Sequence, residues 1–225
     1  MTAIVGWLSV ALLAGSAVWV FGFTPDDALM GFSQKIMYLH VPSVWAAYLA
    51  FFVVFIGSIG YLWKREPGYD RLARCAAEVG VLFCGLVLAT GMLWGRPTWG
   101  TYWVWDARLT TTLLLFLIFM GYVILREFAG QGEQQARLGA IVGIVGFLDI
   151  PLIHVSVQWW RTLHQPSTLF KVGAEGAPKP SMPPELLIPL LVSGAAMIVF
   201  FLFLLLYRLR IAELSDELEE RVAQS

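Results

Sequence analysis

The chain has 225 residues, of which 58% are hydrophobic and only 14% are charged, and its formal net charge is −1. A soluble domain carries about 25% charged residues, so this much apolar surface requires lipid as its solvent. The near-zero net charge offers no basis for binding nucleic acid. The composition therefore predicts an integral membrane protein.

Six apolar stretches approach the roughly 20 residues that a helix needs to cross a bilayer. They cover residues 3–21, 44–63, 75–94, 109–125, 138–157 and 186–207. The first stretch has no basic segment before it and no small-residue cleavage site after it, so it is interpreted as a spanning helix and not as a secretory signal. We therefore predict an all-α membrane protein with six transmembrane helices, forming one domain over residues 1–225.

His40 precedes the second stretch, within the sequence Tyr38-Leu39-His40-Val41-Pro42. A proline restricts the residue before it and stiffens the connection. Cys75 and Cys84 follow in or beside the third stretch, and their nine-residue offset places them on different helix faces. They are not expected to pair, and no Cys-x-x-Cys motif is present to support thiol redox chemistry or covalent haem attachment.

The segment between the third and fourth stretches, residues 94–108, is the most unusual part of the chain. It combines four tryptophans with two glycines and a proline: Trp94, Trp99, Trp103, Trp105, Gly95, Gly100 and Pro97. Tryptophan is common at membrane interfaces, but an interfacial belt does not need glycine, which allows a close approach to a ligand. We interpret this tryptophan-rich loop as a platform for a flat, largely apolar ligand.

Charged residues close the tryptophan-rich loop. Asp106 precedes the fourth stretch, where an acidic residue suits a helix cap, and it could also pair with Arg108. Arg96, Arg108 and Arg161 are candidates for binding carboxylates of a ligand, because a guanidinium group forms bidentate contacts with them.

The fifth stretch and its outer end contain the remaining candidates. Asp149 is the one acid well inside a predicted span, and such residues are usually functional. Pro151 frees the carbonyl of Phe147, so we favour the interpretation of Asp149 as a polar residue at a helix kink, with a functional role as the alternative. His164 lies beyond the span before Pro166, on the same side as His40, and two imidazoles can bind a metal from opposite faces. His154 is nearer the lipid depth and is expected to contact a ligand only indirectly.

Six spans place both termini on one side of the membrane. Loops and tail on that side contain nine basic residues: Lys64, Arg65, Arg71, Arg74, Arg126, Arg137, Arg208, Arg210 and Arg221. The opposite loops contain six: Lys35, Arg96, Arg108, Arg161, Lys171 and Lys179. Basic residues mark the cytoplasmic side, so we expect cytoplasmic termini, an outer tryptophan-rich loop and a cytoplasmic acidic tail over residues 208–225.

Three motifs together resemble those of a known family. They are Trp94-Gly95-x-x-x-Trp99-Gly100-Thr101-x-Trp103-x-Trp105-Asp106-x-Arg108, the His40 motif, and His154-x-Ser156-Val157-x-Trp159-Trp160-x-Thr162-Leu163-His164-Gln165. The first resembles the tryptophan-rich "WWD" signature of haem-handling proteins. In this form it is similar to CcmC, the haem exporter protein C family of system I cytochrome c maturation. The resemblance covers most of the chain.

The resemblance implies that the chain binds haem b, non-covalently and transiently, at the periplasmic face of the bacterial inner membrane. His40 and His164 would be its axial ligands. The platform would comprise Trp94, Gly95, Trp99, Gly100, Trp103, Trp105 and Asp106, with Arg108 beside it. The haem would pass to the haem chaperone CcmE, and the partners would be the ABC-type subunits CcmA and CcmB and the small protein CcmD.

Two other classes of function stay open. An electron-carrying b-type membrane cytochrome usually holds haem between histidines within helices, whereas His40 and His164 are predicted at or beyond span ends. A permease places polar groups near the bilayer midplane, where Asp149 is the only strong candidate. No nucleophile–base pair, phosphate loop or nucleotide motif occurs, so the sequence predicts that the protein is not an enzyme.

Overall fold

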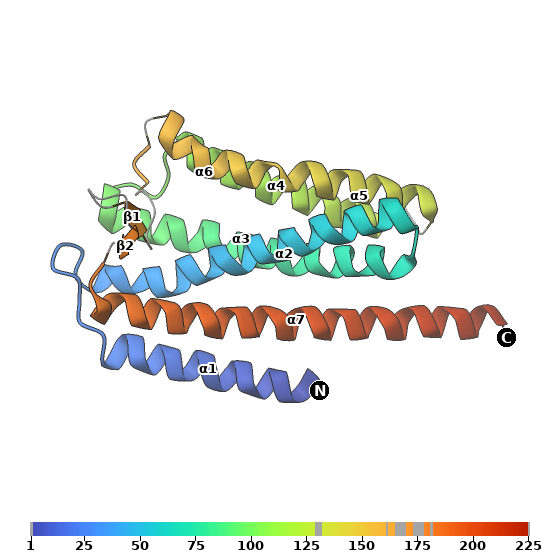
Figure 1. The fold of residues 1–225 in the computed structure, drawn as a ribbon, viewed down its shortest axis with the longest axis horizontal. Coiled ribbons are helices and arrows are strands. Elements are labelled where there is room, and N and C mark those ends of the chain that lie inside the picture. Colours follow the sequence, from blue (N-terminus) through green and yellow to red (C-terminus); the bar gives the residue numbers. More distant parts are fainter. Residues whose placement is uncertain are drawn as a thin grey trace.

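The computed structural model describes residues 2–128, 132–160, 162–164, 170–172, 178–180 and 182–224. Its helices are α1 (Thr2–Gly22), the 3₁₀ helix η1 (Phe32–Ile36), α2 (Met37–Lys64), α3 (Pro67–Trp99), α4 (Ala107–Phe128), α5 (Glu133–Phe147), α6 (Asp149–Trp159) and α7 (Pro184–Gln224). Strands β1 (Phe170–Val172) and β2 (Pro178–Pro180) form one short antiparallel pair. Figure 1 shows the helices running roughly parallel to one long axis.

Six helical segments are long and apolar enough to cross a membrane, which confirms the predicted fold class. They are α1, η1 with α2, α3, α4, α5 with α6, and α7. Successive segments alternate in direction, so the two chain ends lie toward the same end of the bundle (Figure 1). We call this the terminal end, and we call the opposite end, where residues 94–108 lie, the aromatic end.

The antiparallel pair α2 and α3 forms the centre of the bundle (Figure 1). Helix α7 packs against both of them, α1 packs on the outer side of α7, and α4, α5 and α6 cover the opposite side. Phe51 of α2 stacks on Phe119 of α4 with ring centroids 3.9 Å apart, and both side chains are fully buried. The largest apolar core therefore lies between the central pair and its neighbours.

Small residues allow these helices to approach closely. Helix association in lipid depends on close packing, because lipid tails are as apolar as the side chains. A β-carbon added at Gly143 of α5 would lie 2.6 Å from the Ser58 hydroxyl of α2. A β-carbon at Gly194 of α7 would lie 2.2 Å from Cζ3 of Trp45 in α2. These glycines therefore set the spacing of α5 and α7 from the central pair.

Ion pairs add to close packing as the link between helices at the terminal end, where a β-carbon at Gly60 of α2 would overlap the Tyr69 ring of α3. Three pairs connect α3 to its neighbours: Arg126 with Asp70, Arg208 with Glu78 at 2.5 Å, and Arg71 with Asp216 at 2.9 Å. The first of them joins α4 to α3, and the other two join α7 to α3. The terminal end is thus held by ion pairs as well as by packing, whereas the middle of the bundle is held by packing.

Two expected boundaries were wrong, and both errors concern candidate site residues. Helix α2 begins at Met37, so His40 lies inside a helix and not before the second span. Helix α3 continues to Trp99, so residues 94–99 of the predicted loop are helical. Pro97 falls in the last turn, where its missing N–H leaves the Leu93 carbonyl without that helical partner, and Gly100 then ends the helix with a left-handed φ of 79°. Hydropathy indicates which part of a helix the lipid can cover, but a helix can continue beyond that part.

The fifth span is interrupted at the expected place. Helix α5 ends at Phe147, and α6 starts at Asp149. Pro151 has no N–H for the Phe147 carbonyl and its ring obstructs that carbonyl, which explains the break. The sixth span differs from expectation because α7 is a single 41-residue helix, so the acidic tail continues the same helix.

We predict that Gly194→Ala destabilises the bundle by about 1–3 kcal/mol, since the added methyl group would overlap the Trp45 ring. Thermal denaturation in detergent, followed by circular dichroism, measures the change. Gly121→Ala in α4 is the matched control, because a β-carbon there meets nothing within 4 Å. Equal denaturation midpoints for the two variants would contradict the packing role of Gly194.

Candidate functional site

A cavity of about 520 Å³ opens at the aromatic end, between α2 and α3 on one side and α4 and α6 on the other. Its volume falls in the range of about 300–1,000 Å³ that is typical of small-molecule sites. Its lining includes His40, Trp45, Tyr48, Cys84, Gly91, Trp94, Gly95, Trp99, Trp103, Arg108, Thr112, His154 and His164. Residues from four helices and two connecting segments therefore meet around one space.

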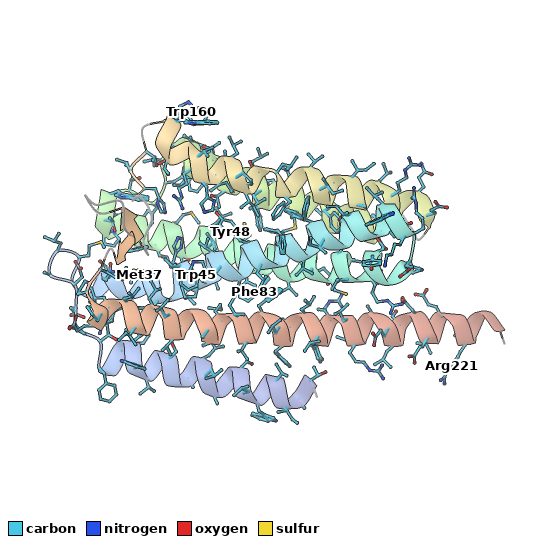
Figure 2. All side chains as sticks on the ribbon, in the orientation of Figure 1. Met37, Trp45, Tyr48, Phe83, Trp160 and Arg221 are labelled. Atoms are coloured by element: carbon cyan, nitrogen blue, oxygen red, sulfur yellow. The ribbon has the colours of Figure 1, made fainter. Side chains whose placement is uncertain are left out.

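Tryptophan and tyrosine side chains form much of the cavity wall. Trp94 and Trp99 come from the last two turns of α3, and Trp103 comes from the segment that follows. Tyr48 and Trp45 come from α2, and Figure 2 shows both of them in the interior of the bundle. Such a wall offers flat apolar faces, which suits a planar ligand.

His40 is held rigidly in this wall. Its side chain is buried, with 8% exposed, and its Nδ1 lies 2.9 Å from the hydroxyl oxygen of Thr90 in α3. The same hydroxyl donates its single proton to the carbonyl of Leu86 at 2.7 Å. It therefore accepts from His40, which places the imidazole proton on Nδ1 and leaves Nε2 with a free lone pair.

Gly91 provides the space for the His40 ring. A β-carbon at this position would lie 3.2 Å from Cε1 of His40 and 3.7 Å from its Nδ1. Thr90 and Gly91 thus act on the same imidazole, one by a hydrogen bond and the other by the absence of a side chain. Neither residue was predicted as part of the site, because both lie within an apolar stretch that shows no motif.

His164 reaches the cavity from the segment after α6. Its ring centroid lies 6.1 Å from that of Trp99, and the ring centroid of His40 lies 5.8 Å from that of Trp94. The backbone N–H of His164 donates to the hydroxyl of Thr162 at 3.1 Å. The two histidines predicted as a pair therefore border one cavity, each beside its own tryptophan.

Asp106 connects the start of α4 to the His164 segment. One carboxylate oxygen accepts the backbone N–H of Leu109 at 2.8 Å, which is the geometry of a helix N-cap. The other oxygen accepts the hydroxyl proton of Thr162. Asp106 is thus a cap and an anchor for Thr162, and it does not line the cavity.

Some side-chain donors of the cavity have no acceptor among the described residues. The indole Nε1 atoms of Trp94 and Trp103 are buried and have no hydrogen-bond partner within the described residues. Arg108 lines the cavity, and no described carboxylate lies within 4 Å of its guanidinium group, so the expected pairing with Asp106 is absent. Unpaired buried donors are costly, and the two indoles together with the Arg108 guanidinium group suit a ligand with negatively charged oxygens.

His154 also borders the cavity, although it was expected to lie farther from a ligand. Its Nδ1 is 3.1 Å from the carbonyl of Ile150, and its ring centroid is 5.3 Å from that of Tyr48. The cavity also includes Cys84, and both cysteines are free, as expected. Among the described residues, no three His, Cys, Asp or Glu side chains form a metal-binding group.

Several candidates lie outside the cavity. Trp105 is 77% exposed and meets the edge of Trp103, with centroids 5.5 Å apart. Gly100 ends α3, and the Arg96 side chain donates to its carbonyl. Arg96 also lies over the ring of Tyr102, so it serves the loop itself. Arg161 lies outside the described residues.

Comparison with known proteins gives one family over nearly the whole chain. Residues 1–224 match the family model of CcmC, heme exporter protein C. Heme exporter protein C of Bradyrhizobium diazoefficiens is 40% identical over 206 residues, covering 91% of this chain and 76% of the relative. The protein of the same name from Escherichia coli K12 is 37% identical over 175 residues, covering 76% and 71%. A ccmC-like mitochondrial protein of Marchantia polymorpha, named for cytochrome c biosynthesis, is 38% identical over 167 residues, covering 74% and 69%.

We predict that Asp106→Ala lowers the free energy of unfolding by about 1–2 kcal/mol, because it removes an N-cap and the acceptor of Thr162. Chemical denaturation in detergent, followed by tryptophan fluorescence, measures the loss. Asp106→Asn keeps an oxygen that can cap α4 and should stay close to the wild type. If the alanine and asparagine variants unfold alike, the capping role is wrong.

Proposed function

The chain belongs to the CcmC family, haem exporter protein C, and from this premise we propose that it binds haem in the aromatic cavity and presents it for cytochrome c maturation. The observation that carries this proposal is the meeting of His40 and His164 in one tryptophan-walled cavity. A bis-histidine site of this kind suits haem iron. The protein supplies binding and orientation, and we infer that it performs no chemical step on its cargo.

The residues present fit haem in three respects. The wall of Trp94, Trp99 and Trp103 suits the faces of a porphyrin. Nε2 of His40 carries a free lone pair, so it is ready to bind iron without losing a proton. The unpaired donors of Trp94, Trp103 and Arg108 suit the two propionates.

Each residue then has a distinct task. His40 and His164 would hold the iron, with Thr90 fixing the tautomer of the first and Asp106 anchoring the segment of the second through Thr162. Arg108 would hold a propionate by a bidentate contact. Trp105 and Gly100 support the shape of the loop and do not touch the haem.

Delivery requires that the haem stay reachable by a partner. Exposed aromatic side chains surround the cavity at the aromatic end: Tyr102, Trp105, Trp159 and Trp160. Figure 2 shows Trp160 at the outer limit of this end, far from Arg221 near the C-terminus. We place this end at the periplasmic face and the termini in the cytoplasm, following the basic residues at the terminal end. The recipient would be CcmE, and the assembly would include CcmA, CcmB and CcmD.

A b-type cytochrome that carries electrons is the second candidate. The position of His40 inside α2 favours it, because such cytochromes hold haem between helical histidines. His164, however, lies in a non-helical segment that follows α6. Reduction of the haem-loaded protein by a quinol would support electron transfer, whereas transfer of the haem to a purified chaperone would support export.

The histidine pair generates a direct prediction. His40→Ala or His164→Ala should remove the low-spin absorption spectrum of the haem-loaded protein and weaken haem binding by more than about tenfold, since even residues that only orient a metal ligand contribute 10–100-fold. Added imidazole should partly restore the spectrum. His154→Ala is the control and should keep it. An unchanged spectrum in the two axial variants would contradict the assignment.

The propionate contact generates another prediction. Arg108→Lys keeps the charge but loses the planar fork, so haem affinity should fall by about fivefold, equivalent to about 1 kcal/mol. Arg96→Lys should bind haem like the wild type, because Arg96 contacts the loop and not the cavity. Fluorescence quenching by haem measures both affinities. Haem dimethyl ester should bind wild type and Arg108→Lys equally, and a preserved difference would argue against the propionate contact.

A further inference from the structure

A second cavity lies at the terminal end and plays no part in the proposed haem site. It has a volume of about 470 Å³ and lies between α3, α4 and α7. In the described structure α4 and α7 both pack against α3 and make little contact with each other, so a groove separates them. The cavity combines three arginines with apolar side chains, chiefly Arg74, Arg126, Arg208, Ile124, Phe128 and Ile211.

Among the described residues, the arginines of this cavity outnumber the carboxylates that pair with them. Arg208 pairs with Glu78 at 2.5 Å, and Arg126 pairs with Asp70. Arg74 has no hydrogen-bond or ion-pair partner among the residues described. Among the described lining residues, Glu78 is the one carboxylate beside three guanidinium groups, and the charge of Arg74 is left for a ligand.

Arg126 adds a second indication of a missing partner. Its side chain is only 7% exposed, yet its Nε and Nη1 atoms are buried without a hydrogen-bond acceptor in the described part of the chain. Nitrogen atoms buried in this way are costly unless an acceptor reaches them. A group with several anionic oxygens in the cavity would supply such acceptors.

The apolar members of the cavity extend to the outer surface of the bundle. Ile124 is 49% exposed and Phe128 is 82% exposed, both on α4. The membrane-crossing segment of α4 ends at Arg126, so Ile124 lies within it and Phe128 lies just beyond it, toward the terminal end. A ligand that satisfies both parts of the cavity has an anionic head at the arginines and an apolar tail along α4.

We propose that this cavity binds an anionic phospholipid, with the phosphodiester group beside Arg74 and Arg126 and an acyl chain along α4 against Val123 and Ile124. Basic pockets between transmembrane helices at the membrane surface bind such headgroups. The cavity has no histidine or tryptophan in its lining, so its chemistry does not match that of the haem site. A free phosphate ion would leave the apolar wall unused. The site is independent of the proposed haem transfer.

The test uses the full-length protein in detergent, with phosphatidylglycerol or phosphatidylcholine added. Phosphatidylglycerol should raise the thermal denaturation midpoint, and phosphatidylcholine should not. Arg74→Gln should need about fivefold more phosphatidylglycerol to reach the same rise in the midpoint, as expected for loss of one charge near a lipid headgroup. Arg137→Gln is the matched control, because Arg137 is exposed on α5 outside the cavity. Arg126 is left intact because it joins α4 to α3.

Several results would overturn the proposal. One is an equal response to the two lipids, and another is an equal response of Arg74→Gln and the wild type. Full stabilisation by glycerol phosphate would reassign the cavity to a free phosphate. Loss of a co-purifying subunit from Arg74→Gln, with an unchanged lipid response, would reassign it to a protein interface. Native mass spectrometry, which should show phosphatidylglycerol retained by the wild type and by Arg137→Gln, checks the same conclusion without denaturation.

Discussion

Lipid cannot hydrogen-bond to a buried polar group, and the rest of the structure depends on this constraint. Within the spans, several polar side chains find partners inside the protein: Ser16 bonds to Ser193 across α1 and α7, and Thr90 bonds to both His40 and the Leu86 carbonyl. Others, namely Ser58, Tyr122 and Asp149, hold a buried atom with no partner among the described residues. An unpartnered group is most informative where it lines a cavity, because a ligand can reach it there. Trp94, Trp103 and Arg126 carry such groups, and each lines one of two cavities.

The two ends of the bundle meet this constraint in different ways. The aromatic end joins flat side chains to a few oriented polar groups, which gives a site that selects for shape. The terminal end uses arginine–carboxylate pairs between helices, which gives strong links with little dependence on shape. The middle of the bundle relies on glycines such as Gly143 and on stacked rings such as Phe51 and Phe119.

Sequence was sufficient for the six spans, because hydropathy and length decide what lipid can cover. It also predicted the interruption near Pro151, since a missing N–H has a local effect. It could not predict that His40 lies within α2 or that Asp106 holds Thr162, because these depend on residues distant in the chain. Thr90 and Gly91 gave no signal at all, since their role exists only where α3 lies against α2.

His40 and His164 are held by different parts of the structure, and this difference affects how quickly a bound cargo can leave. His40 lies within α2, whereas His164 lies in a non-helical segment whose backbone is joined to the start of α4 through Thr162 and Asp106. We expect a cargo bound by both to leave in stages, since a segment outside the helices can move while α2 stays packed. The residence time of the cargo would then follow the movement of that segment and not the full strength of two iron bonds. A protein of this kind would bind its cargo tightly and still release it quickly.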